Sequence, residues 1–230
     1  MSLGVPAFCA EPTPGPSPTH DRYGWVPTGH RDGILTFKRN VPGTKLLAFK
    51  GEGVVEAPLA KVFQVLFDTT RATEWIADLK ECRVVRKISD LEFLEYDRAG
   101  TPPIIMKDRD FLSRVTIEPK PREKTLVMRY EPAEDPAAPP ARKYIRGELK
   151  SCVYVLTAID GGARTEISAE VLCDPKGSVP KWLVNWFQGS WPRDTFVHMR
   201  RQAAKTDIAD WAPYETLMGP SASVEGPKDR

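Results

Sequence analysis

The sequence predicts one α+β domain in which a long run of antiparallel strands is closed by a helix near the C-terminus. Three observations support this prediction: strand patterns that follow one another without intervening helices, one early amphipathic helix, and a tryptophan-rich helix after the last strand. Successive strands with helices segregated to one side are typical of the α+β class. We expect about seven to nine strands in one curved sheet with a large apolar concave face.

The first elements are two strands and a helix. The stretches 34–39 and 46–55 have strand composition and flank Pro42-Gly43, which predicts a hairpin. In the segment 57–68 the apolar residues recur at helical spacing and predict one buried helix face: Leu59, Val62, Phe63, Leu66 and Phe67. A shorter segment, 70–79, carries Trp75.

Six strand patterns follow, at residues 82–88, 91–97, 110–118, 124–130, 148–159 and 164–173. The last is the clearest, because two sets of side chains alternate along it. The apolar set is Ile167, Ala169, Val171 and Cys173, and the polar set is Glu166, Ser168 and Glu170. Such alternation predicts one buried and one hydrated face. We expect a proline-rich loop at 131–142 and a tight turn at 160–162.

The terminal helix, which we expect to begin near Ser178, is unusual in its aromatic content. One stripe holds Val179, Trp182, Leu183, Trp186, Phe187, Ser190 and Trp191. Pro192 lies in the middle of this predicted helix and should kink it. A bulky, bent helix across a curved sheet either leaves a space beneath it or packs as an ordinary core, and both interpretations stay open.

Composition bounds the organisation of the 230 residues. We expect a disordered proline-rich leader over 1–20, a folded domain over 21–208 and a flexible tail over 209–230. The formal net charge is +2 with both signs interspersed, which argues against a nucleic-acid footprint. Apolar runs fall short of the roughly 18 residues of a membrane-spanning helix. The four cysteines are isolated from one another. This favours reduced thiols and a cytoplasmic location, with a periplasmic or secreted location as the alternative if a signal peptide was removed. We also expect a monomer.

Motifs of catalysis and metal binding are missing from the sequence. His20, His30 and His198 are scattered, and the nucleophile-elbow, phosphate-loop and dinucleotide patterns do not occur. We therefore predict no catalytic residue, no metal site and no cofactor.

Two motifs carry a resemblance to a known family. "KDRDF" (107–111) and the pattern D-x-K-G-x-x-P-K (174–181), which opens the last helix, resemble the START family of lipid-transfer domains. The resemblance runs from about Trp25 to Lys205. It implies a helix-grip fold, in which a U-shaped antiparallel sheet wraps around a long C-terminal helix and leaves an internal hydrophobic tunnel. In this family such a tunnel takes one lipid or sterol molecule.

Arg109 is the most conspicuous candidate within these motifs. By strand parity it shares a face with Phe111, Ser113 and Val115. It either anchors a polar group of a ligand or forms an ion pair with Glu92 or Glu95. Val115 occupies the position where some members of the family carry a second inner arginine, which implies a more apolar ligand. The loop 99–106 lies where the family has a flexible loop that gates the tunnel.

The resemblance implies binding of one lipid, sterol or fatty acid-like molecule, transient membrane contact and no nucleic acid. An aromatase/cyclase-like enzyme on the same fold is the alternative, and a pure interaction module ranks third. The residues expected to bind the ligand are Tyr96, Arg109, Phe111, Ser113, Val115, Met128, Tyr130, Ile167, Ala169, Val171, Leu183, Val184, Phe187, Trp191 and Thr195.

Overall fold

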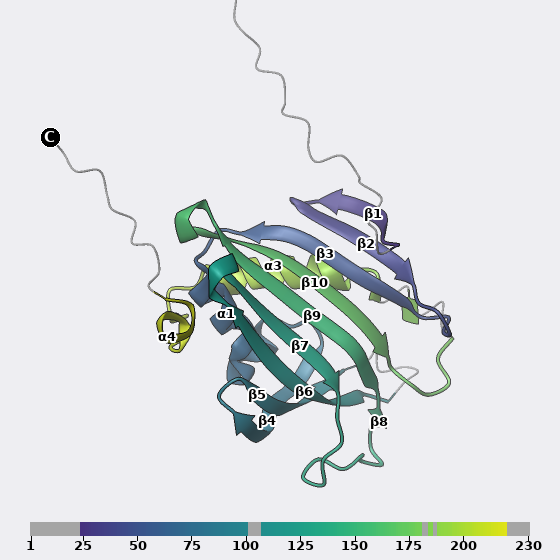
Figure 1. The fold of residues 1–230 in the computed structure, drawn as a ribbon. Coiled ribbons are helices and arrows are strands. Elements are labelled where there is room, and N and C mark those ends of the chain that lie inside the picture. The colour runs from purple at the N-terminus through teal and green to yellow at the C-terminus, as the bar shows by residue number, and fades with distance from the viewer. Residues whose placement is uncertain (1–23, 101–106, 181–183, 186–187, 220–230) are drawn as a thin grey trace, which may run out of the picture.

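The structure is a computed structural model that describes residues 24–100, 107–180, 184–185 and 188–219. One antiparallel sheet dominates it (Figure 1). Its strands are β1 (Val26–Arg31), β2 (Ile34–Asn40), β3 (Leu47–Val55), β4 (Leu79–Ser89), β5 (Glu92–Ala99), β6 (Arg109–Lys120), β7 (Thr125–Pro132), β8 (Ile145–Arg146), β9 (Glu148–Ile159) and β10 (Arg164–Asp174). The α-helices are α1 (Leu59–Phe67), α3 (Trp191–Ala203) and α4 (Tyr214–Met218). Short 3-10 turns lie at Thr69–Glu74, Pro121–Glu123 and Asp160–Gly162.

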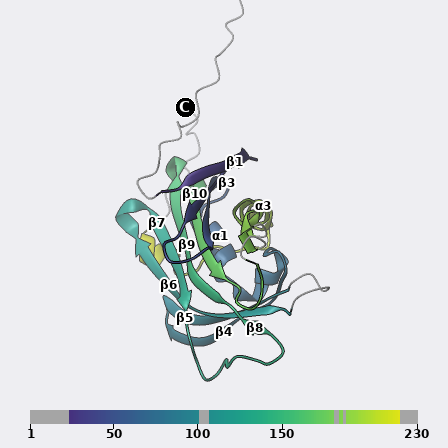
Figure 2. The same ribbon diagram turned by 90° about the vertical axis from the view of Figure 1, so that its right-hand side faces the viewer.

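The strand order is β1-β2-β3-β10-β9-β7-β6-β5-β4, and only β8 leaves this path to pair in parallel with β6. The sheet curls so that α1 and α3 lie on its concave side (Figure 2). The predicted helix-grip architecture is therefore confirmed. The sheet has ten strands, somewhat more than expected. The additional ones are β1, whose six residues are all exposed, and the two-residue β8. Neither shows the alternation of apolar and polar residues that signals a strand.

The clearest strand pattern is confirmed in detail. In β10 the side chains of Thr165, Ile167, Ala169 and Val171 are buried, while Glu166 between them is exposed. β10 lies between β3 and β9, so its buried face contributes to the middle of the concave surface.

The terminal helical region is interrupted, and Pro192 has a different position from the one predicted. The chain leaves the helical conformation at Gly189 and Ser190, and α3 begins at Trp191. Pro192 thus stands in the first turn of a new helix, where the missing N–H needs no partner, instead of in the middle of a kinked helix. Trp182, Leu183, Trp186 and Phe187 lie outside the described residues.

Two glycines of β3 let α3 approach the sheet closely. A Cβ atom at Gly51 would lie 2.9 Å from Pro192 Cβ and 2.9 Å from Phe196 Cε2. A Cβ at Gly53 would lie 3.1 Å from the same ring. The absence of side chains at these positions therefore sets the distance between α3 and the sheet.

The packed fold extends beyond residue 208, into the segment expected to belong to a flexible tail. Trp211 is only 2 % exposed, and its ring lies 4.6 Å from that of Phe63 in α1. None of the described helices has the length and apolar character to cross a membrane.

Candidate functional site

The concave face brings together many of the apolar residues predicted to bind a ligand. They belong to one buried cluster with Phe196 and Met199 of α3. The predicted residues in this cluster are Val115, Met128, Tyr130, Ile167, Ala169 and Val171. Their burial follows from strand parity, because each lies an even number of positions from its neighbours on the same strand.

The described part of the terminal region lies over this cluster. The Trp191 side chain is half-buried, and its ring centroid is 6.2 Å from that of Tyr154 in β9. Val184 is 4 % exposed and Thr195 is half-buried. Leu183 and Phe187 lie outside the described residues, so their predicted role stays a prediction.

Tyr96 was predicted to bind a ligand but lies on the opposite face of the sheet. Its side chain is in a second cluster with Leu94, Leu112 and Ala138. The reason is parity: Tyr96 is flanked by Glu95 and Asp97, and adjacent residues of a strand point to opposite faces. Phe111 is half-buried, with ring atoms so close to Gly147 that a Cβ there would lie 2.4 Å from Phe111 Cε1.

Arg109 has different partners from those predicted. It is 4 % exposed, and Nη1 donates to the carbonyl oxygen of Lys107 at 2.6 Å. Nε donates to the carbonyl oxygen of Pro175 at 3.3 Å. Glu92 instead pairs with Arg114 at 2.9 Å. Burial lowers the pKa of Arg109, and the charge of Asp108 partly opposes this effect. Arg109 therefore fastens the turn before the terminal helix to the start of β6.

Gly177 occupies the same junction and has a left-handed backbone conformation, which favours glycine, with φ of +73°. A Cβ at this position would lie 3.2 Å from Cδ1 of Ile145 in β8. The two motifs of the sequence and the short strand β8 are thus in contact where the terminal region begins.

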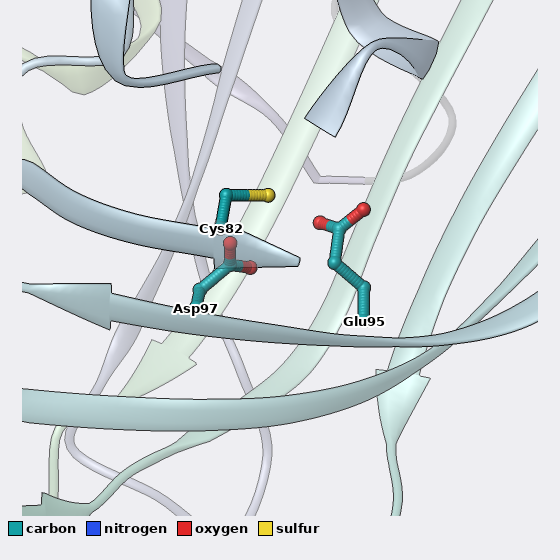
Figure 3. Close-up of side chains that lie close together, drawn as sticks. All are labelled: Cys82, Glu95 and Asp97. Atoms are coloured by element: carbon teal, nitrogen blue, oxygen red, sulfur yellow. The ribbon is translucent and has the colours of Figure 1, made fainter. Parts of the chain in front are cut away.

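Three side chains with metal-ligating atoms gather on β4 and β5: Cys82, Glu95 and Asp97 (Figure 3). Their ligating atoms all lie within 4.8 Å of one another. Glu95 is 5 % exposed, and the other two are half-buried. From the sequence, Glu95 was predicted only as a partner of Arg109. The alternation Phe93, Glu95, Asp97 was the available signal, because it places two acids on the face that Phe93 shares with the core.

The electrostatics of this group follow from burial and from the proximity of two acids. Burial raises the pKa of Asp97 to about 6, although it accepts hydrogen bonds from the Cys82 thiol and the Glu95 carboxyl. Burial, and then the charge of Asp97, raise the pKa of Glu95 well above its ordinary value. The two carboxyl groups therefore hold a shared proton near neutral pH.

The same group makes the surrounding interior electronegative. Burial raises the pKa of Tyr130 and Tyr154 well above the ordinary value, and the negative charges of Glu95 and Asp97 raise both further. Burial also raises the pKa of the Cys152 thiol, and the charges of Glu95 and Asp97 add to this effect. These side chains thus belong to the same interior as the acid pair.

The acid pair and the thiol could hold a metal ion by geometry. Burial and the nearby acids raise the pKa of the Cys82 thiol, so that the thiol is protonated in the metal-free protein. The histidines of the described chain, His30 and His198, are not part of the group. The carboxyl groups of Glu95 and Asp97 therefore suit a ligand that donates hydrogen bonds to them.

A sequence model of the START domain matches residues 20–205. An uncharacterized protein of Pseudomonas aeruginosa is 27 % identical over 182 residues, which cover 79 % of this chain and 87 % of that protein. The mitochondrial steroidogenic acute regulatory protein of Gallus gallus is 27 % identical over 161 residues, covering 68 % of this chain. The match spans only 56 % of that relative's length.

Solved structures share the fold. The human StAR-related lipid transfer protein 5 superimposes with a TM-score of 0.71 at 18 % identity, and the match covers 80 % of this chain and 88 % of that chain. At this level of identity, the likeness concerns the fold alone.

Proposed function

Because the chain belongs to the START domain family, we propose that it binds a single lipid- or sterol-like molecule between the concave face of the sheet and the terminal helical region. Hydrophobic ligand binding is the common property of START relatives, and the names of two relatives refer to lipid transfer and steroidogenesis. The proposal adds to this common property an internal tunnel and a single lipid- or sterol-like ligand in it.

The concave apolar surface is the observation that carries the proposal. It contains Met128, Leu156, Ile167 and Ala169, each with essentially no exposure, and it is covered by α1 and α3. A site for an apolar molecule requires such a surface with a few polar groups placed within it. The acid pair, Ser113 and the phenols of Tyr130 and Tyr154 provide these groups.

We further propose that the protein carries or senses its ligand without chemical change, as a monomer that contacts membranes transiently. A cyclase would use the same surface, so turnover of a poly-β-ketone substrate is the measurement that distinguishes the two functions. Fold likeness does not choose between them, because one fold supports several chemistries.

Native mass spectrometry of the freshly purified full chain, followed by organic extraction, tests the binding proposal. We expect one lipid-sized adduct per chain, and an increase in Tm with at least one member of a sterol, fatty-acid and phospholipid panel. If no adduct is retained and no panel member raises the Tm, the proposal is overturned.

Two matched variants of β10 test the location. Ala169→Leu places a leucine on the concave face, and Ser168→Leu places the same side chain on the other face of the same strand. We expect ligand retention to fall in the first variant and to persist in the second. Equal retention in both variants would place the ligand elsewhere.

A further inference from the structure

The carboxyl groups of Glu95 and Asp97 have no cationic partner among the described residues. Their hydrogen bonds connect them to each other and to the Cys82 thiol. The cations on the neighbouring strands are committed to other acids: Arg114 pairs with Glu92, and Arg98 pairs with Glu81 and Asp108. A pair of buried carboxyl groups without a counter-charge is costly. It is therefore a feature that needs an explanation.

Ser113 provides a second, independent observation. It lies directly opposite Glu95 in the antiparallel pairing of β5 and β6, so both side chains project from the same face. Its side chain has no exposure, and Oγ has no hydrogen-bond partner among the described residues. A buried hydroxyl group without a partner destabilises the protein, so a bound group that hydrogen-bonds to it gains that lost interaction.

The electronegative interior determines which ligands suit the cluster. The charges of Glu95 and Asp97 disfavour ionisation of Tyr130 and Tyr154, and they would disfavour a ligand carboxylate or phosphate in the same way. A neutral hydroxyl group could donate one hydrogen bond but would leave the charge of the pair unbalanced. An ammonium group donates three hydrogen bonds and supplies the missing positive charge.

We propose that Glu95, Asp97 and Ser113 form a subsite for the protonated amino group of a hydrophobic ligand. The subsite rests on the proposed function, since it assumes that the apolar part of the molecule occupies the concave face. Carboxylate oxygens of Glu95 and Asp97 accept hydrogen bonds from two N–H groups, and Ser113 Oγ accepts the third. The proton that the two carboxyl groups share stays between them, so that the single negative charge of the pair balances the cation.

Three ligands with the same chain length test the class of ligand: dodecylamine, dodecan-1-ol and dodecanoate. At pH 7 the amine is cationic and the carboxylate anionic. We expect the full-length protein to bind the amine at least about 10-fold more tightly than the alcohol, and the carboxylate most weakly. Isothermal titration calorimetry measures the three affinities.

Substitutions that preserve shape test the residues. The double variant Glu95→Gln, Asp97→Asn should lose the preference for the amine, while it still binds the alcohol. Glu92→Gln is the matched control: it removes a carboxylate from the same strand, but one that pairs with Arg114. The control should keep the preference for the amine.

The outcomes separate this subsite from the proposed function. Equal affinity for the three ligands overturns the amine subsite and leaves hydrophobic binding intact. Failure of all three to bind, together with an empty lipid panel, overturns both. If Zn²⁺ alone binds tightly, Cys82→Ser abolishes that binding and the amine shows no preference, the cluster is a metal site and the amine subsite is overturned.

Discussion

Arg109 Nε donates a hydrogen bond to the carbonyl oxygen of Pro175, at 3.3 Å across 66 positions of the sequence. This bond joins the start of β6 to the turn that precedes the terminal helical region. Arg109 also holds the carbonyl oxygen of Lys107, where the described chain resumes after residue 100. One buried guanidinium thus fixes two segments that border the concave face.

Replacing Arg109 should therefore destabilise the fold through unsatisfied carbonyl groups. We expect Arg109→Ala to lower the free energy of unfolding by about 1–3 kcal/mol, since two partly buried carbonyl oxygens lose the donor that a buried side chain supplies. Arg109→Lys should recover only part of this loss, because an ammonium lacks the planar fork that reaches both oxygens. Urea unfolding measures the effect. Arg114→Ala, which breaks an exposed pair with Glu92, should cost less than about 1 kcal/mol. Equal losses in the two alanine variants would contradict this role of Arg109.

Gly177→Ala should be more harmful than the same change at Gly43. Both glycines have positive φ, +73° and +78°, so both variants pay the cost of a left-handed alanine, about 1–2 kcal/mol. A Cβ at Gly43 meets open space, whereas one at Gly177 lies 3.2 Å from Ile145 Cδ1. We expect the additional loss at Gly177 to appear as lower Tm and weaker ligand retention. Indistinguishable variants would show that the contact with Ile145 has no energetic role.

The acid pair predicts how stability changes with pH. Asp97 has a pKa of about 6 in the folded chain against an ordinary value of 3.8, so the folded state binds more protons between these values. Stability then decreases as pH rises through this interval. The raised pKa of Glu95 extends the decrease to higher pH. In Glu95→Gln, Asp97→Asn we expect a flatter profile and higher stability at pH 8, by more than about 1 kcal/mol. Chemical unfolding of the ligand-free protein between pH 4 and pH 8 measures both profiles. If the two profiles run parallel, the pair does not hold an extra proton in the folded state.

The fold could be predicted largely because its strands follow the period-2 rule. β10 is the best example, since Ile167, Ala169 and Val171 alternate with polar residues and are buried as expected. β1 could not be found in this way: it is an exposed edge strand that contains a proline and a glycine and has no apolar face. β1 is recognised as a strand only from its antiparallel pairing with β2.

The site was less predictable because its polar residues depend on contacts between strands. Parity placed Ser113 and Val115 correctly on the concave face. The partner of Arg109 could not be predicted, because a backbone carbonyl leaves no mark in the sequence. The acid pair was overlooked for another reason: two acids in one strand usually indicate a hydrated face, and only the neighbouring Phe93 shows that this face is buried.

Substitution of Trp191 can show whether the start of α3 belongs to a solid core or to a ligand-binding surface. Its side chain is half-buried and touches Tyr154, whereas Phe196, five residues further along α3, is 1 % exposed and lies against Gly51 and Gly53. Phe196→Ala should cost about 3–5 kcal/mol, as expected for a packed aromatic core residue.

Trp191→Ala should cost clearly less than this in the ligand-free protein, because fewer of its atoms are removed from water. It should, however, reduce ligand retention more than Phe196→Ala does. For this comparison each variant is measured at the same number of degrees below its own Tm. Urea unfolding and native mass spectrometry of the same two preparations supply the two quantities. A loss of 3–5 kcal/mol for Trp191→Ala, with unchanged ligand affinity, would mean that Trp191 is a core residue. In that case, the ligand does not reach the N-terminal end of α3.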